Sequence, residues 1–178
     1  MKYSRVHMES IGYELPPVVI TSEDLEQRLM PMYDALHIAP GQLESLTGIY
    51  ERRWWEKGHI LSDGAANAAK KALEQSNVEA RDFEALVYTG VCRENFEPAT
   101  ACAVAAQLGI SDDANIYDIS NACLGVMNGI IDIANRIELK QIRAGMVVSC
   151  ETSREIVEIM IERMLKDKTI DMFSSSLA

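Results

Sequence analysis

Short apolar runs alternate with helical patterns through much of the chain, and this order restricts the folds open to it. Residues 85–90, 115–119 and 144–149 are short and apolar, which is typical of buried strands. Residues 99–108 form a helical pattern of small residues between the first two runs. Residues 124–139 are apolar on nearly all faces of their first turns, which predicts a buried helix. The alternation predicts an α/β layered fold.

The first part of the chain predicts further elements. Residues 3–12 alternate loosely and predict a strand. Thr21 or Ser22 can cap a helix that runs towards Met30, where Pro31 is expected to interrupt it. Three more helices are predicted: a short one from Gln42, one over 63–75 with Ser62 as its N-cap, and one over 154–166 with Ile156, Met160 and Met164 in one apolar stripe.

Charge and composition exclude several classes of function. The formal net charge of −10 repels phosphate backbones, which argues against nucleic acid as a partner. No apolar run approaches the roughly 18 residues that a transmembrane helix needs, and the N-terminus does not resemble a signal peptide. The four cysteines form no C-x-x-C pair and no metal-type spacing, so we predict reduced thiols, no metal site and a cytoplasmic location.

Cys123 stands at a predicted strand-to-helix turn. A thiol at a helix N-terminus faces the positive end of the helix dipole and unpaired N–H groups, and both favour the nucleophilic thiolate. Gly125 and Gly129 follow one turn apart, where the absence of a side chain allows a backbone or a substrate to approach closely. Taken alone, a cysteine before an apolar helix often serves only as a small buried hydrophobic residue. We expect Cys92, Cys102 and Cys150 to be inert cysteines of this kind.

Three segments carry a resemblance to a known family. The sequence NACLGVMNG at 121–129 resembles the nucleophile motif of the ketoacyl synthase III branch of the thiolase superfamily. TGI at 47–49 with ERR at 51–53 and FEPATA at 96–101 resemble two further segments of that branch. The resemblance implies a thiolase-like fold with a mixed sheet flanked by helices. It implies that residues 1–178 are the N-terminal half-domain, ending before its last strand, and that a C-terminal half with a catalytic His and Asn is absent.

Within the branch, the sequence is most similar to the head-to-head acyl-CoA condensing enzymes of long-chain olefin biosynthesis. The similarity lies in TGVCR at 89–93, Glu97-Pro98 and YDISNACLG at 117–125. It implies that a fatty acyl-CoA acylates Cys123 and that Glu97, reaching across a homodimer, deprotonates the α-carbon of a second acyl-CoA. The product is a 2-alkyl-3-ketoacyl chain, formed by Claisen condensation without decarboxylation. The plainer reading of Glu97 is a solvated acid before Pro98, with Pro98 as the first residue of the next helix.

Two alternative functions stay open at this point. One is a reaction with a malonyl donor, as in 3-oxoacyl-carrier-protein synthases III, and the other is a catalytically silent half-domain that acts by binding or assembly. The predicted partners are coenzyme A thioesters as substrates, with no bound cofactor, and a second copy that pairs through residues 115–119. Residues that would bind coenzyme A stay unassigned: Arg52, Arg53, Trp54 and Trp55 suit phosphate contacts and stacking, or a surface turn.

The remaining polar residues receive structural roles. His7, His37 and His59 lie in no motif of the family, so we expect them on the surface or in packing positions. Arg93 and Glu94 are expected to be solvated loop charges.

Overall fold

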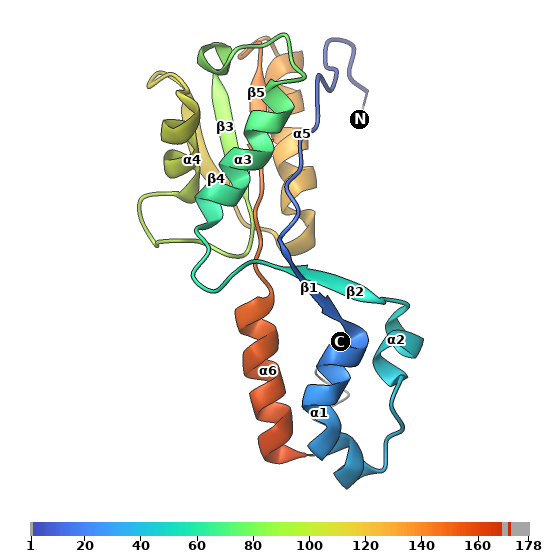
Figure 1. Ribbon diagram of the computed structural model, residues 1–178. Coiled ribbons are helices and arrows are strands. Elements are labelled where there is room, and N and C mark those ends of the chain that lie inside the picture. The colour runs from blue at the N-terminus through green and yellow to red at the C-terminus, as the bar shows by residue number, and fades with distance from the viewer. Residues whose placement is uncertain (1, 169–170, 172–178) are drawn as a thin grey trace. The chain divides into compact units, whose positions relative to one another are not determined.

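The computed structural model describes residues 2–168 and 171, which divide into two compact units. The first unit combines the segment up to Glu14 with Gly58–Glu151, and the second combines Leu15–Lys57 with the segment from Thr152 onwards. Figure 1 shows the elements of both units. The predicted chain ending over residues 173–178 lies outside the described residues.

A three-stranded parallel sheet forms the centre of the first unit. β3 (Ala85–Thr89) lies between β4 (Asn115–Ile119) and β5 (Gly145–Val148) in the order β4-β3-β5. In this register Val87 lies opposite both Tyr117 and Val147. Every residue of β3 is buried, as expected for the central strand of a sheet covered on both faces. The three strands predicted from the apolar runs are confirmed.

Helices cover both faces of this sheet (Figure 1). α3 (Leu61–Leu73) and α4 (Thr100–Leu108) lie on one face, and α5 (Gly125–Glu138) lies on the other. Short 3₁₀ turns, η1 (Ala80–Asp82) and η2 (Ala122–Leu124), precede β3 and α5. The core between the sheet and α5 contains Ala85, Val87, Ile133 and Ile142.

α5 packs closely on the sheet because two contact positions are glycine. A Cβ on Gly129 would lie 2.9 Å from Cγ2 of Thr89 and 2.9 Å from Cγ1 of Val147. A Cβ on Gly145 would lie 2.6 Å from Cδ1 of Ile133. The close approach predicted for the glycines after Cys123 therefore occurs at Gly129, where the side chains of the sheet make it, and not at Gly125, whose nearest neighbour would lie at 3.5 Å.

The second unit is built around an antiparallel pair of strands. β1 (Val18–Thr21) pairs with β2 (Glu51–Trp54), and three helices complete the unit: α1 (Ser22–Leu36), α2 (Gln42–Thr47) and α6 (Arg154–Asp167). Its buried core is made by Leu25, Leu29, Met32, Tyr33, Trp54, Ile161 and Met164. Parallel and antiparallel pairings thus both occur among the described strands, in two separate sheets, and the predicted α/β class is confirmed.

Side chains hold the N-terminal ends of α1 and α2. Thr21 caps α1 in a capping box with Asp24, which confirms the predicted helix start. The buried Glu26 accepts the backbone N–H groups of Gly41 and Leu43, both at 2.6 Å, and so holds the start of α2. Burial, with the nearby Glu26 carboxylate as a smaller cause, raises the pKa of Tyr33 to about 12.

Residues 3–12 form no strand, so that prediction is wrong. The segment is held by side chains: the Glu138 carboxylate accepts the backbone N–H groups of Ser4 at 2.9 Å and Arg5 at 3.0 Å. The backbone of Gly12 packs directly against α3, so an added Cβ would come within 2.2 Å of the Ala68 carbonyl oxygen. The backbone N–H groups of Ser4 and Arg5 thus have acceptors without a neighbouring strand. The alternation in the sequence does not reveal these side-chain acceptors.

Two predicted helix boundaries were wrong, in α1 because of packing and in α3 because a distant side chain supplies the cap. α1 passes through Pro31 to Leu36, since Met32 and Tyr33 are completely buried and anchor its last turns. α3 begins at Leu61, with Ile60 at the N-cap position, and the Ser62 N–H donates to Oε1 of Glu94 at 2.5 Å. Glu94 is therefore a capping side chain and not a solvated loop charge.

The boundary of α4 also differs from the prediction. The helix begins at Thr100 with Ala99 at the N-cap position, so Pro98 precedes the helix and is not its first residue. The Asp118 carboxylate accepts the N–H groups of Thr100 and Ala101 at 3.0 and 2.9 Å. A carboxylate from the neighbouring strand β4 thus replaces a local cap.

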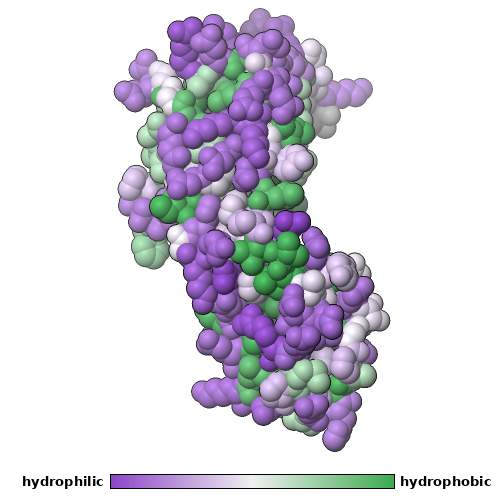
Figure 2. All heavy atoms as spheres, viewed as in Figure 1, coloured by the Kyte–Doolittle hydropathy of each residue, from purple (hydrophilic) through white to green (hydrophobic). Residues whose placement is uncertain are grey.

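Apolar residues at the start of α5 are exposed, although a buried helix was predicted there. Leu124, Val126 and Met127 are 60%, 41% and 54% exposed, because only the face of α5 towards the sheet is covered. In α6, Ile156 is also exposed, and the packed positions are Val157, Met160, Ile161 and Met164. On the face drawn in Figure 2, hydrophilic side chains predominate and hydrophobic ones gather in separate patches. No helix in the described part of the chain is long and apolar enough to cross a membrane.

Candidate functional site

Cys123 occupies the sharp turn between β4 and α5. It is the middle residue of η2, and it is exposed. Ala122 before it has a left-handed backbone with φ of 43°, a conformation that costs an alanine about 1 kcal/mol. The Asn121 side-chain amide donates to Oδ1 of Asn128 at 2.6 Å and joins the two sides of the turn. The predicted placement of Cys123 at a strand-to-helix turn is confirmed.

This turn places the Cys123 thiol at the start of a helix. The chain enters α5 two residues after Cys123, so the thiol lies by the positive end of the helix dipole and the first helical N–H groups. The exposure of Cys123 also leaves its sulfur open to a substrate.

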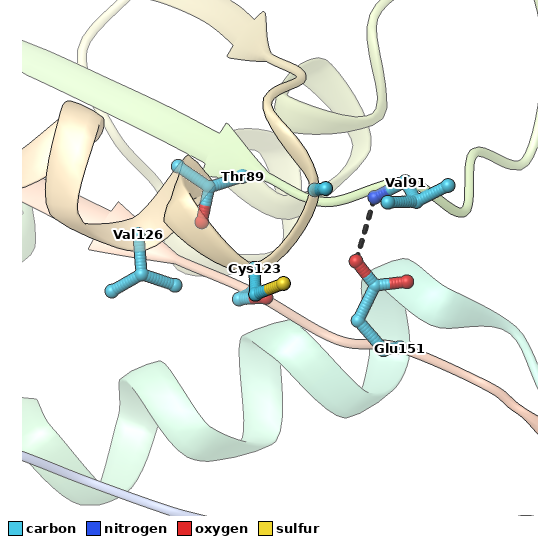
Figure 3. Close-up of a pocket in the computed structure, with 7 residues that line it drawn as sticks. Thr89, Val91, Cys123, Val126 and Glu151 are labelled. Atoms are coloured by element: carbon cyan, nitrogen blue, oxygen red, sulfur yellow. Dashed lines mark hydrogen bonds between the residues drawn. The ribbon is translucent and has the colours of Figure 1, made fainter. Parts of the chain in front are cut away.

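A pocket of about 310 Å³ opens beside the cysteine. It lies at the carboxyl ends of the three parallel strands, which is the usual ligand site of open α/β sheets. Figure 3 shows the cysteine sulfur with Thr89 and Val126 on one side and Val91 and Glu151 on the other. The lining residues are Thr89, Val91, Ala122, Cys123, Val126, Ser149 and Glu151.

Hydrogen bonds fix the strand ends around this pocket. The Thr89 hydroxyl donates to the Val148 carbonyl at 3.3 Å, and the Tyr88 hydroxyl donates to the Cys150 carbonyl at 2.5 Å. Burial raises the pKa of Tyr88, with Cys150 and Glu151 as smaller causes, so the hydroxyl stays protonated and remains a donor. These bonds join the end of β3 to the end of β5 and to the segment after it.

Glu97 lies apart from the Cys123 pocket within this chain. It is exposed, it is not among the lining residues, and the Glu97–Pro98 peptide bond is cis. Its neighbour Phe96 is 98% exposed. The structure therefore does not bring the two predicted catalytic residues together in one copy of the chain.

The four residues considered for coenzyme A contacts are largely engaged within the second unit. Arg52 donates to the Ser22 hydroxyl at 3.0 Å, and Trp54 is 3% exposed in the core. The Arg154 guanidinium lies 5.7 Å from the centre of the Trp54 ring and donates to the Trp55 carbonyl at 3.0 Å. Trp54 is thus a core residue, and coenzyme A contacts remain unassigned.

The histidines have the surface or packing positions expected of them. His7 contacts Glu9 with its side chain 79% exposed, His37 ends α1, and His59 is half-buried. No group of three or more His, Cys, Asp or Glu side chains in the described residues is arranged to hold a metal ion. Among the cysteines, Cys150 is buried as expected, whereas Cys102 is exposed on α4.

Glu151 is a site residue that the sequence reasoning missed. Its carboxylate lines the pocket and accepts the backbone N–H groups of Val91 and Cys92. Its position shortly after β5 was the available signal, because the carboxyl ends of parallel strands meet at one edge of the sheet. Asn121 and Asn128 were also missed as partners, although both lie in the segment that contains Cys123.

Comparison with known proteins agrees with this architecture. Residues 49–171 match the family model for the thiolase N-terminal domain. The chain is 61% identical over its whole length to an acyl-CoA:acyl-CoA alkyltransferase of Shewanella oneidensis. It is 35% identical over its whole length to the protein of that name from Xanthomonas campestris pv. campestris. A beta-ketoacyl-[acyl-carrier-protein] synthase III of Caldanaerobacter subterraneus is 32% identical over 82% of the chain.

A solved structure also shares the fold of this chain. The crystal structure of a Xanthomonas campestris OleA variant with bound lauric acid and lauroyl-CoA superposes with a TM-score of 0.89 at 33% identity. That match covers 96% of this chain and 50% of the OleA chain. The chain likewise spans 51% of the Shewanella protein and 53% of the Xanthomonas relative. With its family-model match over most of its length and a fold shared with OleA, the chain belongs to the thiolase family.

Proposed function

We propose that this chain is the nucleophile-bearing half of an enzyme that condenses two fatty acyl-CoA molecules head to head. The observation that carries the proposal is the exposed Cys123 at the start of α5, beside a pocket at the carboxyl ends of the sheet. The names of the Shewanella and Xanthomonas relatives, and the lauroyl-CoA bound to OleA, support acyl-CoA as the substrate class.

The first step in this proposal is acyl transfer to sulfur. The Cys123 thiolate attacks the thioester carbonyl of one acyl-CoA, a new C–S bond forms, and coenzyme A leaves as a thiolate that takes up a proton. The Cys123 backbone N–H supplies one hydrogen-bond donor to the oxyanion. We assign the other donors to the His and Asn of the second half that the family resemblance implies, with residues 1–178 as the first half-domain.

The second step needs a base, and we assign it to Glu97. Its carboxylate takes a proton from the α-carbon of a second acyl-CoA, and the carbanion attacks the Cys123 thioester. A C–C bond forms, the C–S bond breaks, and the Cys123 thiolate is restored. The product is a 2-alkyl-3-ketoacyl thioester, with no carboxyl group lost.

Glu97 serves the pocket of a second copy in this proposal. Two observations support a homodimer: Glu97 is exposed away from the pocket lining of its own chain, and β4 is the edge strand next to Cys123. An edge strand presents unpaired backbone groups that the same strand of a second copy can satisfy. Exposed Phe96, Val126 and Met127 supply apolar surface for the same contact.

The setting of the reaction is also part of the proposal. We assign the chain to the cytoplasm, because its thiols show no disulfide-type spacing and its substrates are coenzyme A thioesters. We place the condensation in long-chain olefin synthesis on the strength of the Glu97-Pro98 segment together with the motif around Cys123.

A chimaera tests the function. This chain replaces the matching segment of the Shewanella relative, and product is measured with fatty acyl-CoA alone and with an added malonyl donor. Head-to-head condensation predicts product from acyl-CoA alone. Product that appears only with the malonyl donor would favour the synthase III reaction, for which the 32% identical Caldanaerobacter relative is the support. A folded chimaera without product under either condition would indicate a silent half-domain.

Mixing two inactive variants tests the role of Glu97 across the dimer. Glu97→Gln is expected to lower condensation at least a hundredfold, the size of a general-base contribution, and to leave acylation of Cys123 intact. A mixed dimer of the Glu97→Gln and Cys123→Ala chimaeras contains one complete site if Glu97 acts on the partner's cysteine. Recovered activity supports this arrangement, and none would show that Glu97 acts within its own chain or not at all.

A further inference from the structure

Glu151 binds the start of the loop that contains Glu97. Its two carboxylate oxygens accept consecutive backbone N–H groups, Oε1 from Val91 at 2.6 Å and Oε2 from Cys92 at 3.1 Å. Figure 3 shows the carboxylate extended from the segment after β5 towards Val91. Hydrogen bonds to an ionised acceptor are about twice as strong as neutral ones, so this contact is a strong link between the two segments.

A side chain at position 90 would push against this carboxylate and against the Tyr88 ring. A Cβ on Gly90 would lie 2.9 Å from Oε1 of Glu151 and 3.1 Å from Cε1 of Tyr88. The Cys92 carbonyl lies 3.2 Å from the Tyr88 hydroxyl oxygen, as the longer of two acceptors that share its O–H. The loop therefore leaves β3 in contact with Glu151 and Tyr88 at once, and its first residues have a defined course.

Two further carboxylates hold the rest of the loop. Oε1 of Glu94 accepts the Ser62 N–H at the start of α3, and Asp118 accepts the Thr100 and Ala101 N–H groups where α4 begins. Residues 95–98 lie between these two anchors and are exposed. The position of Glu97 is thus set by anchors on both sides of it, and Glu151 is the anchor nearest to β3.

We propose that Glu151 is a positioning residue, which holds the 90–99 loop so that Glu97 is placed for proton abstraction and Val91 forms a wall of the Cys123 pocket. The proposal rests on the function proposed above, and its anchoring part can be tested without any reaction. Loss of the carboxylate leaves two backbone donors without their acceptors, and the loop then samples other conformations. A base held less firmly loses much of the benefit of orientation.

Amide hydrogen exchange of the 178-residue chain tests the anchor. Glu151→Ala is expected to raise exchange at Val91 and Cys92 about tenfold or more, with the amides of β3 and β4 unchanged as a sign of intact folding. Glu151→Gln retains one carbonyl acceptor and should give an intermediate rise. Glu79→Ala, which removes an exposed carboxylate paired with Arg81, is the matched control and should leave the loop unchanged. Unchanged exchange in Glu151→Ala would overturn the proposal.

Separate acylation and condensation rates in the chimaera test the positioning role. Glu151→Ala is expected to lower the condensation rate about tenfold or more, to lower the rate of Cys123 acylation by a clearly smaller factor because Glu97 acts only in condensation, and to be partly rescued by Glu151→Gln. Equal losses in both rates, or unchanged condensation despite faster exchange, would overturn the assignment to Glu97 positioning. A parent chimaera that acylates Cys123 without condensing would contradict the proposed function, while the exchange result would still decide the anchor.

Discussion

The Asp118 carboxylate on β4 accepts the Ala101 backbone N–H at 2.9 Å and so caps a helix seventeen residues earlier in the chain. The same carboxylate accepts the Thr100 N–H, and Ala99 at the N-cap position has no side-chain oxygen of its own to offer. The strand that leads to Cys123 and the helix that follows the Glu97 loop are therefore joined by one side chain.

Removal of this cap should destabilise the fold. Asp118→Ala is expected to lower the free energy of unfolding by about 1–2 kcal/mol, the usual value of an N-cap, and Asp118→Asn by less because one acceptor remains. Urea unfolding measures the difference. Asp113→Ala, an exposed carboxylate in the turn before β4, serves as the control and should stay within about 0.5 kcal/mol of the parent. Equal losses for Asp118→Ala and the control would contradict the capping role.

The two glycines after Cys123 should respond differently to alanine. A Cβ at Gly129 meets Thr89 and Val147 at 2.9 Å, so Gly129→Ala is expected to cost about 1–2 kcal/mol of stability by overpacking. A Cβ at Gly125 meets its nearest neighbour, Cβ of Thr89, at 3.5 Å, which is ordinary contact. Gly125→Ala should therefore be neutral or stabilising by up to about 1 kcal/mol, the difference in helix propensity. Thermal unfolding of both variants checks this, and a reversed order would refute the packing of α5 on the sheet.

Attachment of the N-terminal segment should depend on pH. The Ser4 hydroxyl, followed by the Ser4 and Arg5 N–H groups, lowers the pKa of Glu138 below its ordinary value of 4.5. Because the folded-state pKa is the lower one, the stabilisation is complete above the ordinary value and is lost as the pH falls through the lowered pKa. Exchange at the Ser4 and Arg5 amides, corrected for the intrinsic effect of pH, should therefore rise between about pH 5 and about pH 3.

A variant isolates the contribution of Glu138 to this behaviour. Glu138→Gln is expected to weaken the attachment at neutral pH and to remove the pH-dependent step. A step of the same size in this variant would show that another group controls it.

Local patterns in the sequence were sufficient for the parallel sheet and for the position of Cys123. β3, β4 and β5 are short apolar runs, and the turn at Cys123 follows directly from a strand that meets a helix. Apolar periodicity reports which residues a layered fold buries, and for these elements no distant contact altered the outcome.

Contacts between distant residues explain the errors. The N–H of Ser62 finds its acceptor at Glu94, 32 residues away, and the N–H of Ser4 finds its acceptor at Glu138, 134 residues away. Such side-chain acceptors replace the local cap or the strand partner that a sequence pattern assumes. The exposure of Val126 and Met127 was also unforeseeable, because the apolar pattern does not say which faces of α5 the rest of the chain covers.

The role of Glu97, unlike the position of Cys123, is not tested by the contacts within one chain. The family resemblance implied that Glu97 is a base, and the structure leaves it exposed on a loop held by Glu94 and Asp118. A residue that acts on a second copy leaves no trace in the contacts of its own chain. Its role stays a proposal that the mixed-dimer experiment decides.

Intact mass of the 178-residue chain after incubation with lauroyl-CoA tests the central claim, that Cys123 is the acyl-accepting nucleophile. The account predicts a mass gain of one lauroyl group that disappears in Cys123→Ala and persists in Cys102→Ala, which removes another exposed thiol. A folded sample that gains no acyl group would show that acylation needs the second half proposed above, and a gain that survives in Cys123→Ala would contradict the claim.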